Sequence, residues 1–344
     1  MQLLYQAHTI QRGGHRIHAR DYSGGAPAII LMHGFPDNLH LYDALVPLLV
    51  KAGRRVITFD FLGWGSSDKP DDHTYDHHSL TQDLDAVIRH FALEGVVFVA
   101  HDASGPPAID WALDHPSAIA GLVLLNTYYH ATPTLRAPEA IFAFSRPFGV
   151  GKLFQKVSQY RDWFRRLYWY QVGHFIRSRA SREAFVPLLY QQMDGPLASS
   201  TKKAFFGLND DLVWTNIQRL SRVPQMRQFQ RPVRIIFGAG DQYLNVGVAR
   251  DFHRLFPNSE LFLLEEGWHF VQIDEPERVA QHILEMPLME THWAGEALSP
   301  QQQSHPVRLR MMYLMFGLMN ILFAPVILAD RWRIFRRVQT VFND

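Results

Sequence analysis

The sequence predicts an α/β protein with a mostly parallel central sheet, helices on both of its faces and an inserted helical segment. Three observations support this fold class. Short apolar runs alternate with helical patterns, the alternation stops at residue 128 and resumes after residue 230, and chemically reactive residues follow the ends of several runs. Strands that alternate with helices indicate βαβ units and therefore parallel pairing.

The first half of the predicted sheet consists of four runs rich in aliphatic and β-branched residues. Runs of this kind are typical of strands that are buried on both faces. Helical patterns are present at Leu41–Leu49 and Leu80–Phe91. The four runs are Ala28–Met32, Arg55–Asp60, Val96–Ala100 and Leu122–Leu125.

Residues 128–230 contain no clear strand pattern and many aromatic residues, so we expect a helical cap. The core is then built from residues 1–127 and 231–290. The cap is expected over the carboxyl edge of the sheet, where open α/β sheets bind their ligands. The second part of the core is predicted from strands at Val233–Phe237 and Leu261–Leu264 and helices at Val246–Leu255 and Pro276–Glu285.

The amino-acid composition excludes several classes of function. The 344 residues are 47% apolar with a formal net charge of +1, which suits a large buried core and gives no field that would favour nucleic acid. The absence of cysteine excludes disulfides, thiolate catalysis and cysteine metal sites. His77 and His78 beside Asp76 are the best metal candidate, but no further ligand is identifiable, so we interpret them as a solvated helix start. We expect no metal and no organic cofactor.

Both ends of the sequence bear on its location. Residues 1–8 lack the basic start and apolar stretch of a secretory signal, so we expect a cytosolic catalytic domain. Residues 291–344 form an extension in which Met311–Ala329 is apolar and uncharged and is flanked by arginines. Residues 311–337 could contact a membrane as a spanning or interfacial helix, or they could pack on protein. Fractionation of the full-length chain distinguishes these cases.

Asp102 is the candidate nucleophile. It ends a predicted strand and precedes a predicted helix, which is the context of a nucleophile elbow. The residues two positions before and after such a nucleophile must be small, and here they are Ala100 and Ser104. Centring the elbow on Ser104 would place Asp102 and Pro106 there, which fits less well. A helix-capping role for Asp102 would not explain the residues that follow.

Asp241 and His269 complete a predicted triad. Each follows a predicted strand, and the chain order of nucleophile, acid and histidine is that of one family of triad enzymes. His33-Gly34-Phe35-Pro36 follows the first buried strand, so the amide of Phe35 and that of Ala103, after the nucleophile, are expected to form an oxyanion hole.

These residues resemble the α/β-hydrolase superfamily over about residues 5–290, and more closely its branch of epoxide hydrolases and haloalkane dehalogenases. The resemblance implies an α/β-hydrolase fold and an Asp102 that forms an ester with an sp3 carbon. His269 would activate water to cleave that ester. The matching motifs are HGFP at 33–36, GWGSSDKP at 63–70, HDASG at 101–105, LVLLNT at 122–127, GAGD at 238–241 and GWHFVQIDEPERVA at 267–280.

Two departures from the family pattern bear on the substrate. Both groups usually carry Trp after the nucleophile, where this chain has Ala103, and in dehalogenases that indole holds halide. A phenylalanine at the position of Phe35 resembles the pattern of epoxide hydrolases and of fluoroacetate dehalogenases. The fluoroacetate dehalogenases, however, carry Arg directly after the nucleophile, where this chain has Ala103. Epoxide hydrolases also use two cap tyrosines as hydrogen-bond donors. Tyr160, Tyr168, Tyr170 and Tyr190 are available, and we expect the substrate-binding hydroxyls among Tyr168, Tyr170 and Tyr190.

The leading prediction is hydrolysis of an epoxide or a related electrophilic carbon in a small apolar molecule. The alternatives are a haloalkane dehalogenase, an esterase that uses Ser104, and a non-catalytic binding member of the fold. Diol formation compared with halide release separates the first two, and a phosphonate probe would label an active serine.

Overall fold

The computed structural model describes residues 3–136, 156, 165–166, 168–169, 172–193 and 198–292. Tyr160, Tyr170 and the apolar segment Met311–Ala329 lie outside these residues. None of the helices in the described ranges is both long and apolar enough to cross a membrane.

In the described part of the chain, eight strands form a single sheet with the order β1-β2-β4-β3-β5-β6-β7-β8. β2 pairs antiparallel with β1 and with β4, and the pairs from β4 through β8 are all parallel. The predicted mostly parallel sheet is therefore confirmed. The strands are β1 (Gln6–Arg12), β2 (His15–Tyr22), β3 (Gly25–Met32), β4 (Arg54–Phe59), β5 (Val96–Asp102), β6 (Ile119–Thr127), β7 (Val233–Gly238) and β8 (Ser259–Leu264).

The hairpin of β1 and β2 was not predicted from the sequence. β1 lies at the edge of the sheet, and of its side chains only Ile10 is fully buried, so the strand lacks the apolar run that marks the inner strands. Its turn uses Gly13 and Gly14 at φ values of 56° and 87°, a conformation that glycine adopts without strain.

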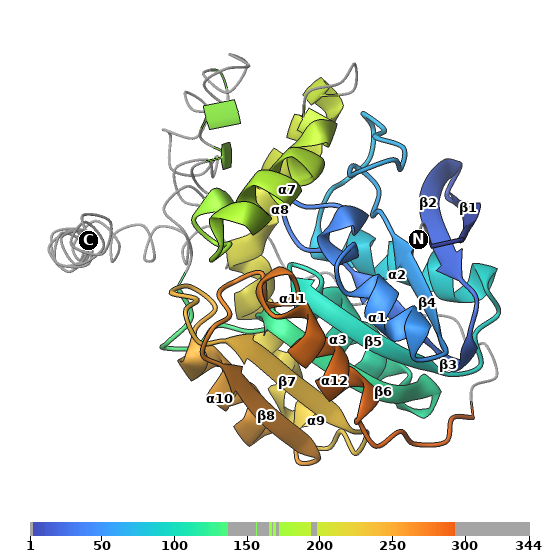
Figure 1. Ribbon diagram of the computed structural model, residues 1–344, viewed down its shortest axis with the longest axis vertical. Helices are drawn as coiled ribbons and strands as arrows, with labels where there is room; N and C mark the ends of the chain where they lie inside the picture. Colours follow the sequence, from blue (N-terminus) through green and yellow to red (C-terminus); the bar gives the residue numbers. More distant parts are fainter. Residues whose placement is uncertain are drawn as a thin grey trace, which may run out of the picture.

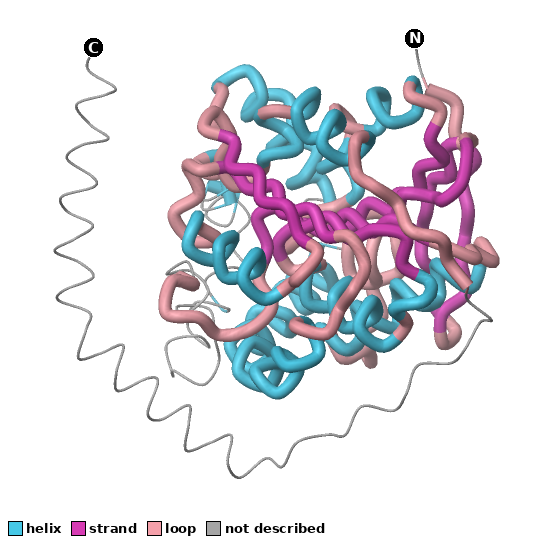
Figure 2. The backbone as a smooth tube through the Cα atoms, turned by 90° about the horizontal axis from the view of Figure 1, so that it is seen from below, coloured by secondary structure: helices cyan, strands magenta, loops and turns pink. Residues whose placement is uncertain are grey.

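Helices cover both faces of the sheet, as Figure 2 shows for the band of strands between two helical layers. This arrangement follows from the strands, because β6 is buried along its whole length and must be covered on each side. The covering helices and turns are η1 (Leu39–Tyr42), α1 (Val46–Lys51), α2 (His77–His90), α3 (Gly105–Asp114), η2 (Pro116–Ala118), α10 (Val246–Leu255), α11 (Val271–Asp274) and α12 (Pro276–Leu284).

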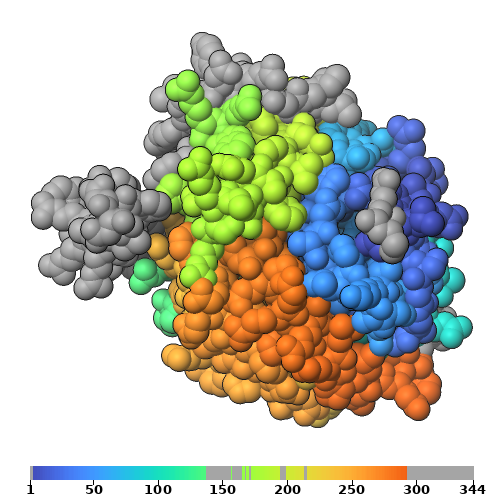
Figure 3. Space-filling view, viewed as in Figure 1, coloured from blue at the N-terminus to red at the C-terminus, as the bar shows by residue number. Residues whose placement is uncertain are grey.

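Between β6 and β7 the described residues form helices and connecting turns. Figure 1 places α7 and α8 at one edge of the sheet, and Figure 3 shows this segment packed against both the blue N-terminal part and the orange C-terminal part. It belongs to the predicted cap at 128–230, whose limits stay a prediction. The elements are α7 (Arg179–Tyr190), η4 (Gln191–Met193), α8 (Ala198–Gln218), η5 (Arg219–Arg222) and α9 (Val223–Met226).

A buried ion-pair cluster attaches the end of this helical segment to the core. Asp110 of α3 is 1% exposed and accepts from Nε of Arg219 at 2.8 Å and from Nη1 of Arg222 at 2.9 Å. The hydroxyl of Tyr129 donates to the same carboxylate at 2.7 Å. A buried carboxylate with this many donors is well compensated for its loss of hydration.

Candidate active site

Asp102 ends β5 in a strained turn at the carboxyl edge of the sheet. Its φ is 50°, a conformation that few non-glycine residues adopt and that is common at functional sites. A Cβ on Gly34 would lie 2.6 Å from Cβ of Asp102, so the loop after β3 can approach the turn only with glycine there. A Cβ on Gly105 would meet the Thr127 side chain at 1.9 Å, so α3 also depends on glycine to pack against β6.

Two backbone amides hold the Asp102 carboxylate. The amide of Phe35 donates to Oδ1 at 2.9 Å, and the amide of Ala103 also bonds to the carboxylate. The two amides predicted for the oxyanion hole are thus brought together at the same carboxyl group. Burial raises the pKa of Asp102, while the nearby His269 and these two amide bonds oppose that rise.

Asp241 and His269 form the expected hydrogen-bonded pair. Nδ1 of His269 lies 2.7 Å from Oδ2 of Asp241. The other oxygen of Asp241 accepts from the amides of Tyr243 at 2.9 Å and Leu244 at 3.1 Å. This arrangement fixes the carboxylate and, through it, the orientation of the imidazole ring.

Asn126 supports the acid and was not predicted as a site residue. Its Nδ2 lies 3.1 Å from Oδ2 of Asp241, and its Oδ1 accepts from the amide of Gly238 at 2.7 Å. Asn126 is fully buried near the end of β6 with a φ of 25°. A buried polar residue at the carboxyl end of a predicted inner strand was the available signal.

His269 faces Asp102, the predicted nucleophile, without a hydrogen bond to it. Nε2 of His269 lies 3.8 Å from Oδ2 of Asp102, beyond hydrogen-bonding distance. Burial lowers the pKa of His269, but the charge of Asp241, the hydrogen bond to it and the charge of Asp102 outweigh burial and raise the pKa to about 9.

The side chain of Ser104 serves the backbone of the turn. Its Oγ donates toward the carbonyls of Met32 and His101, each at 2.8 Å, and accepts from the amide of His101 at 2.9 Å. The residue is fully buried. A hydroxyl used in this way has no contact with His269 that could activate it, so the geometry argues against the Ser104 esterase.

Aromatic side chains pack beside His269 and on the side chain of Phe35, whose amide holds Asp102. The ring of Phe35 lies 5.7 Å from Trp64 and 4.8 Å from Phe205 of α8. The ring of Phe175 lies 5.1 Å from His269. Phe175 and Phe205 were not singled out in the sequence, because aromatic residues in a helical segment are more often core than site. They make an apolar environment that strengthens charge interactions.

The predicted tyrosines reach the loop that follows β3. The hydroxyl of Tyr168 donates to the carbonyl of Pro36 at 3.1 Å, and its ring packs on Tyr190 at 5.0 Å. Both side chains are buried, at 4% exposed each. Tyr168 therefore lies beside Pro36, but its hydroxyl proton is donated to the backbone carbonyl of that residue. Tyr170 lies outside the described residues.

The predicted helix start at His77 and His78 is confirmed, since α2 begins at His77 with Asp76 as its N-cap, but His77 is buried and not solvated. His77 is 1% exposed, its Nδ1 lies 2.6 Å from Oδ2 of Asp211 on α8, and its Nε2 lies 2.8 Å from the hydroxyl of Tyr128. Burial, followed by the charge of Asp102, raises the pKa of Tyr128. Only the tertiary fold brings these three residues together.

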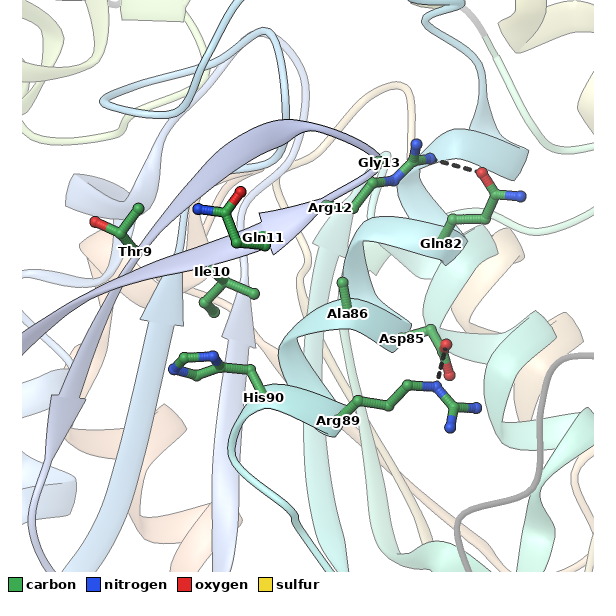
Figure 4. Close-up of a pocket in the computed structure, with 10 residues that line it drawn as sticks. All are labelled: Thr9, Ile10, Gln11, Arg12, Gly13, Gln82, Asp85, Ala86, Arg89 and His90. Carbon is green, nitrogen blue, oxygen red and sulfur yellow. Dashed lines mark hydrogen bonds and ion pairs between the residues drawn. The ribbon is translucent and has the colours of Figure 1, made fainter.

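A separate hollow of about 680 Å³ lies between β1 and α2, at the far edge of the sheet (Figure 4). Arg12 and Gln82 are bonded to each other across it, and Arg89 is bonded to Asp85. No triad residue lines this hollow. Among the described residues, no group of three or more metal-binding side chains is arranged around a common point.

Comparison with known proteins agrees with this geometry. Residues 27–276 match the family described as the alpha/beta hydrolase fold. The chain is 24% identical to the AB hydrolase superfamily protein YfhM of Bacillus subtilis over 277 residues, which are 75% of this chain and 89% of that protein. It is 25% identical to a cis-3-alkyl-4-alkyloxetan-2-one decarboxylase of Xanthomonas campestris over 259 residues, 72% of this chain and 84% of that protein.

Shorter matches and a solved structure point to the same superfamily. The bifunctional epoxide hydrolase 2 of Sus scrofa is 30% identical over 142 residues, 41% of this chain and 25% of that protein. The haloalkane dehalogenase DatA of Agrobacterium tumefaciens superposes with a TM-score of 0.68 at 20% identity, over 81% of this chain and 94% of that chain. Because the family match covers most of the chain, this protein belongs to the α/β hydrolase fold family. Since relatives in that family carry the names of enzymes, we conclude that it is a hydrolase of that fold.

Proposed function

We propose that the protein hydrolyses an electrophilic sp3 carbon through a covalent ester on Asp102. The observation that carries this proposal is the carboxylate at the elbow, with Oδ1 held by the amide of Phe35 at 2.9 Å and Oδ2 directed to the side of His269. A carboxylate is already a nucleophile at neutral pH and needs no base to deprotonate it, in keeping with the 3.8 Å gap to His269.

In the first step, Oδ2 of Asp102 attacks the carbon and displaces the leaving atom. The product is an alkyl ester whose acyl oxygen lies at the amides of Phe35 and Ala103. These donors then stabilise the oxyanion that forms when water adds to the ester carbonyl. The same two amides thus orient the nucleophile first and stabilise the tetrahedral intermediate later.

The second step needs His269 in its neutral form. At rest the ring is protonated, because its pKa is about 9 in the field of Asp241 and Asp102. Ester formation removes the charge of Asp102, so one of the causes that raise this pKa is lost. The histidine therefore becomes a better general base once the ester has formed.

An oxygen leaving group is favoured over a halogen. Ala103 offers no indole to hold halide, whereas the matched relatives include an epoxide hydrolase and an enzyme named for an oxetan-2-one. We therefore propose a strained oxygen ring in a small apolar molecule, first of all an epoxide. The second candidate is carbon–halogen hydrolysis, which the 35% identity with a fluoroacetate dehalogenase over 107 residues favours.

Covalent trapping tests the proposal. The His269→Gln variant is incubated with an epoxide, an oxetan-2-one, a bromoalkane and fluoroacetate, and the intact mass and the Asp102 peptide are measured. We expect a stable adduct on Asp102 with at least one of them, since the variant forms the ester but cannot cleave it. No adduct in this panel, or an adduct on Ser104, would contradict an Asp102 ester.

A further inference from the structure

Asp37 is a buried carboxyl group that the triad does not use. Its side chain is fully buried, and neither Oδ1 nor Oδ2 has a hydrogen-bond partner in the part of the chain that the structure describes. Leaving a carboxylate in this condition costs several kcal/mol, so a native protein keeps such a group only where something else compensates for it or depends on it.

The backbone of Asp37 is fixed beside the oxyanion hole. It lies two residues after Phe35, its amide donates to the carbonyl of Gly34 at 3.3 Å, and its own carbonyl accepts from Nε2 of Gln192 at 3.1 Å. The position of its side chain is therefore set by the loop that holds Asp102 and by a residue of the helical segment above it.

Asp37 lies close to the triad in the fold, because it follows Phe35 by two residues and the amide of Phe35 is bonded to Asp102. The charges of Asp102 and His269 both act on Asp37, and the charge of Asp37 acts in turn on Tyr42 and Tyr168. The hydroxyls of these two tyrosines donate to backbone carbonyls, Tyr42 to Met32 at 2.6 Å and Tyr168 to Pro36 at 3.1 Å. Neither of these hydroxyls is directed at the Asp37 carboxyl group.

Asp37 holds a proton at neutral pH. Burial and the negative charge of Asp102 raise the pKa of Asp37 to about 8, while His269 opposes that rise. A neutral carboxyl group has an O–H that can donate. Here that donor is buried in the loop whose Phe35 amide holds Asp102, and it has no acceptor among the described residues, so it is available to a substrate atom.

We propose that Asp37 is the acid that protonates the leaving oxygen when Asp102 opens the ring. This inference rests on the proposed function and assigns the proton donor to the core of the protein, since the hydroxyl of Tyr168 is already engaged. It also specifies the substrate class, because only an oxygen leaving group needs that proton.

The protons balance over a full cycle. A lone pair of Asp102 forms the new C–O bond, the ring C–O bond breaks with its electron pair on the ring oxygen, and that oxygen takes the proton of Asp37. The negative charge has then moved from Asp102 to Asp37. The Asp37 carboxylate takes up the proton of His269, which leaves a neutral imidazole as base and restores the acid.

Hydrolysis regenerates the starting state. His269 accepts a proton from water as the oxygen of that water bonds to the ester carbon. When the intermediate collapses, the bond from the acyl carbon to the alkyl oxygen breaks and its electron pair stays on that oxygen. Asp102 is then a carboxyl group that carries the hydroxyl from water, and its proton passes to the alkyl oxygen. The products are the diol, an ionised Asp102, a protonated His269 and a neutral Asp37. A halide would instead leave as an ion and take no proton from Asp37.

The test compares alkylation by a matched pair of probes, 1,2-epoxyhexane and 1-bromohexane, in the His269→Gln background. The rate of adduct formation on the Asp102 peptide is measured with Asp37, with Asp37→Asn and with Asp37→Glu. Asp43→Asn is the control, since Asp43 lies in the same segment with its side chain partly in solvent. We expect Asp37→Asn to slow the epoxide reaction roughly 100-fold, within the range of general acid catalysis.

We further expect Asp37→Glu to restore most of that rate, and the bromide reaction to change by less than about threefold, since it needs no acid. An unchanged epoxide rate in Asp37→Asn would overturn the inference. So would an equal loss with both probes, or a failure of Asp37→Glu to recover activity while the variant stays folded, because either result indicates a structural role. Absence of any adduct with Asp37 intact would contradict the Asp102 ester itself, which separates the two failures.

Discussion

Nδ1 of His269 lies 2.7 Å from Asp241, whereas Nε2 of the same ring lies 3.8 Å from Asp102. The histidine is thus bonded to the acid and only faces the nucleophile. In a serine enzyme the base must reach the nucleophile at hydrogen-bonding distance to remove its proton. The spacing seen here suits a histidine that acts later, on water.

Replacing the nucleophile is expected to abolish turnover while the protein still folds. Asp102→Ala removes the proposed nucleophilic carboxylate and leaves the backbone turn in place, so hydrolysis should fall by at least about 1,000-fold. Ser104→Ala is the matched comparison. It should cost about 1–3 kcal/mol of stability through lost buried hydrogen bonds but keep activity. Hydrolysis assays and urea unfolding of both variants check this, and a reversed pattern would contradict the carboxylate mechanism.

A methyl group on Gly34 is expected to disable the oxyanion hole. Its Cβ would lie 2.6 Å from Cβ of Asp102, so the loop must move and carry the Phe35 amide with it. Loss of one such donor lowers kcat about 100-fold or more. Gly173→Ala is the control, because a Cβ there meets its nearest neighbour at 3.8 Å. Equal kcat values in the two variants would show that the Phe35 amide does not act in the reaction.

The pH dependence of stability should report His269. Its pKa rises from 6.5 to about 9 on folding, so the folded state holds the proton more tightly. The stabilisation is then complete below pH 6.5 and is lost as the pH rises through about 9. Urea titrations of the wild type and His269→Gln across this range should show a difference in unfolding free energy that shrinks with increasing pH. A constant difference would mean that His269 is neutral at rest.

The Asp110 cluster is expected to hold the helical segment on the core. Asp110→Ala leaves the guanidinium groups of Arg219 and Arg222 without their shared carboxylate, which should cost about 3–5 kcal/mol. The double variant Asp110→Leu with Arg219→Met should recover part of this loss, since it removes both buried charges. Thermal and urea unfolding measure the effect. A loss below about 1 kcal/mol would place the cluster in solvent rather than in the interior.

Features of the fold that depend on local patterns could be predicted from the sequence. The helix at Val246–Leu255 was placed at its observed bounds, because Asn245 caps it and its apolar residues recur on one face. The edge hairpin could not be found in the same way, since its strands alternate and carry polar residues on exposed faces. The limits of the cap remain a prediction.

The site residues also divide into those that local sequence patterns predict and those that only the tertiary fold brings together. Asp102 ends a strand and Asp241 and His269 each follow one, so their approach at one edge of the sheet could be predicted from the parallel pairing, the elbow motif and the chain order. Asp37 gave no such signal, because a carboxyl group in a turn is ordinarily solvated and only the fold shows it buried. The contact of His77 with Asp211 likewise joins residues that are 134 positions apart.

The attachments of the helical segment differ in strength around the site, and this difference bears on how a substrate enters. Near α8 and η5 the attachments are buried, at His77 and at Asp110. At Arg177 the attachment is more exposed: the guanidinium pairs with Glu266, and the two side chains are 42% and 63% exposed. The amide of Arg177 also donates to Asp274 at 2.9 Å. Exposed pairs contribute little to stability, so we expect the helical segment to move near Arg177 before it moves near Asp110 when a substrate enters. Glu266 lies on the loop that carries His269, so such a movement would also act on the segment that holds the histidine.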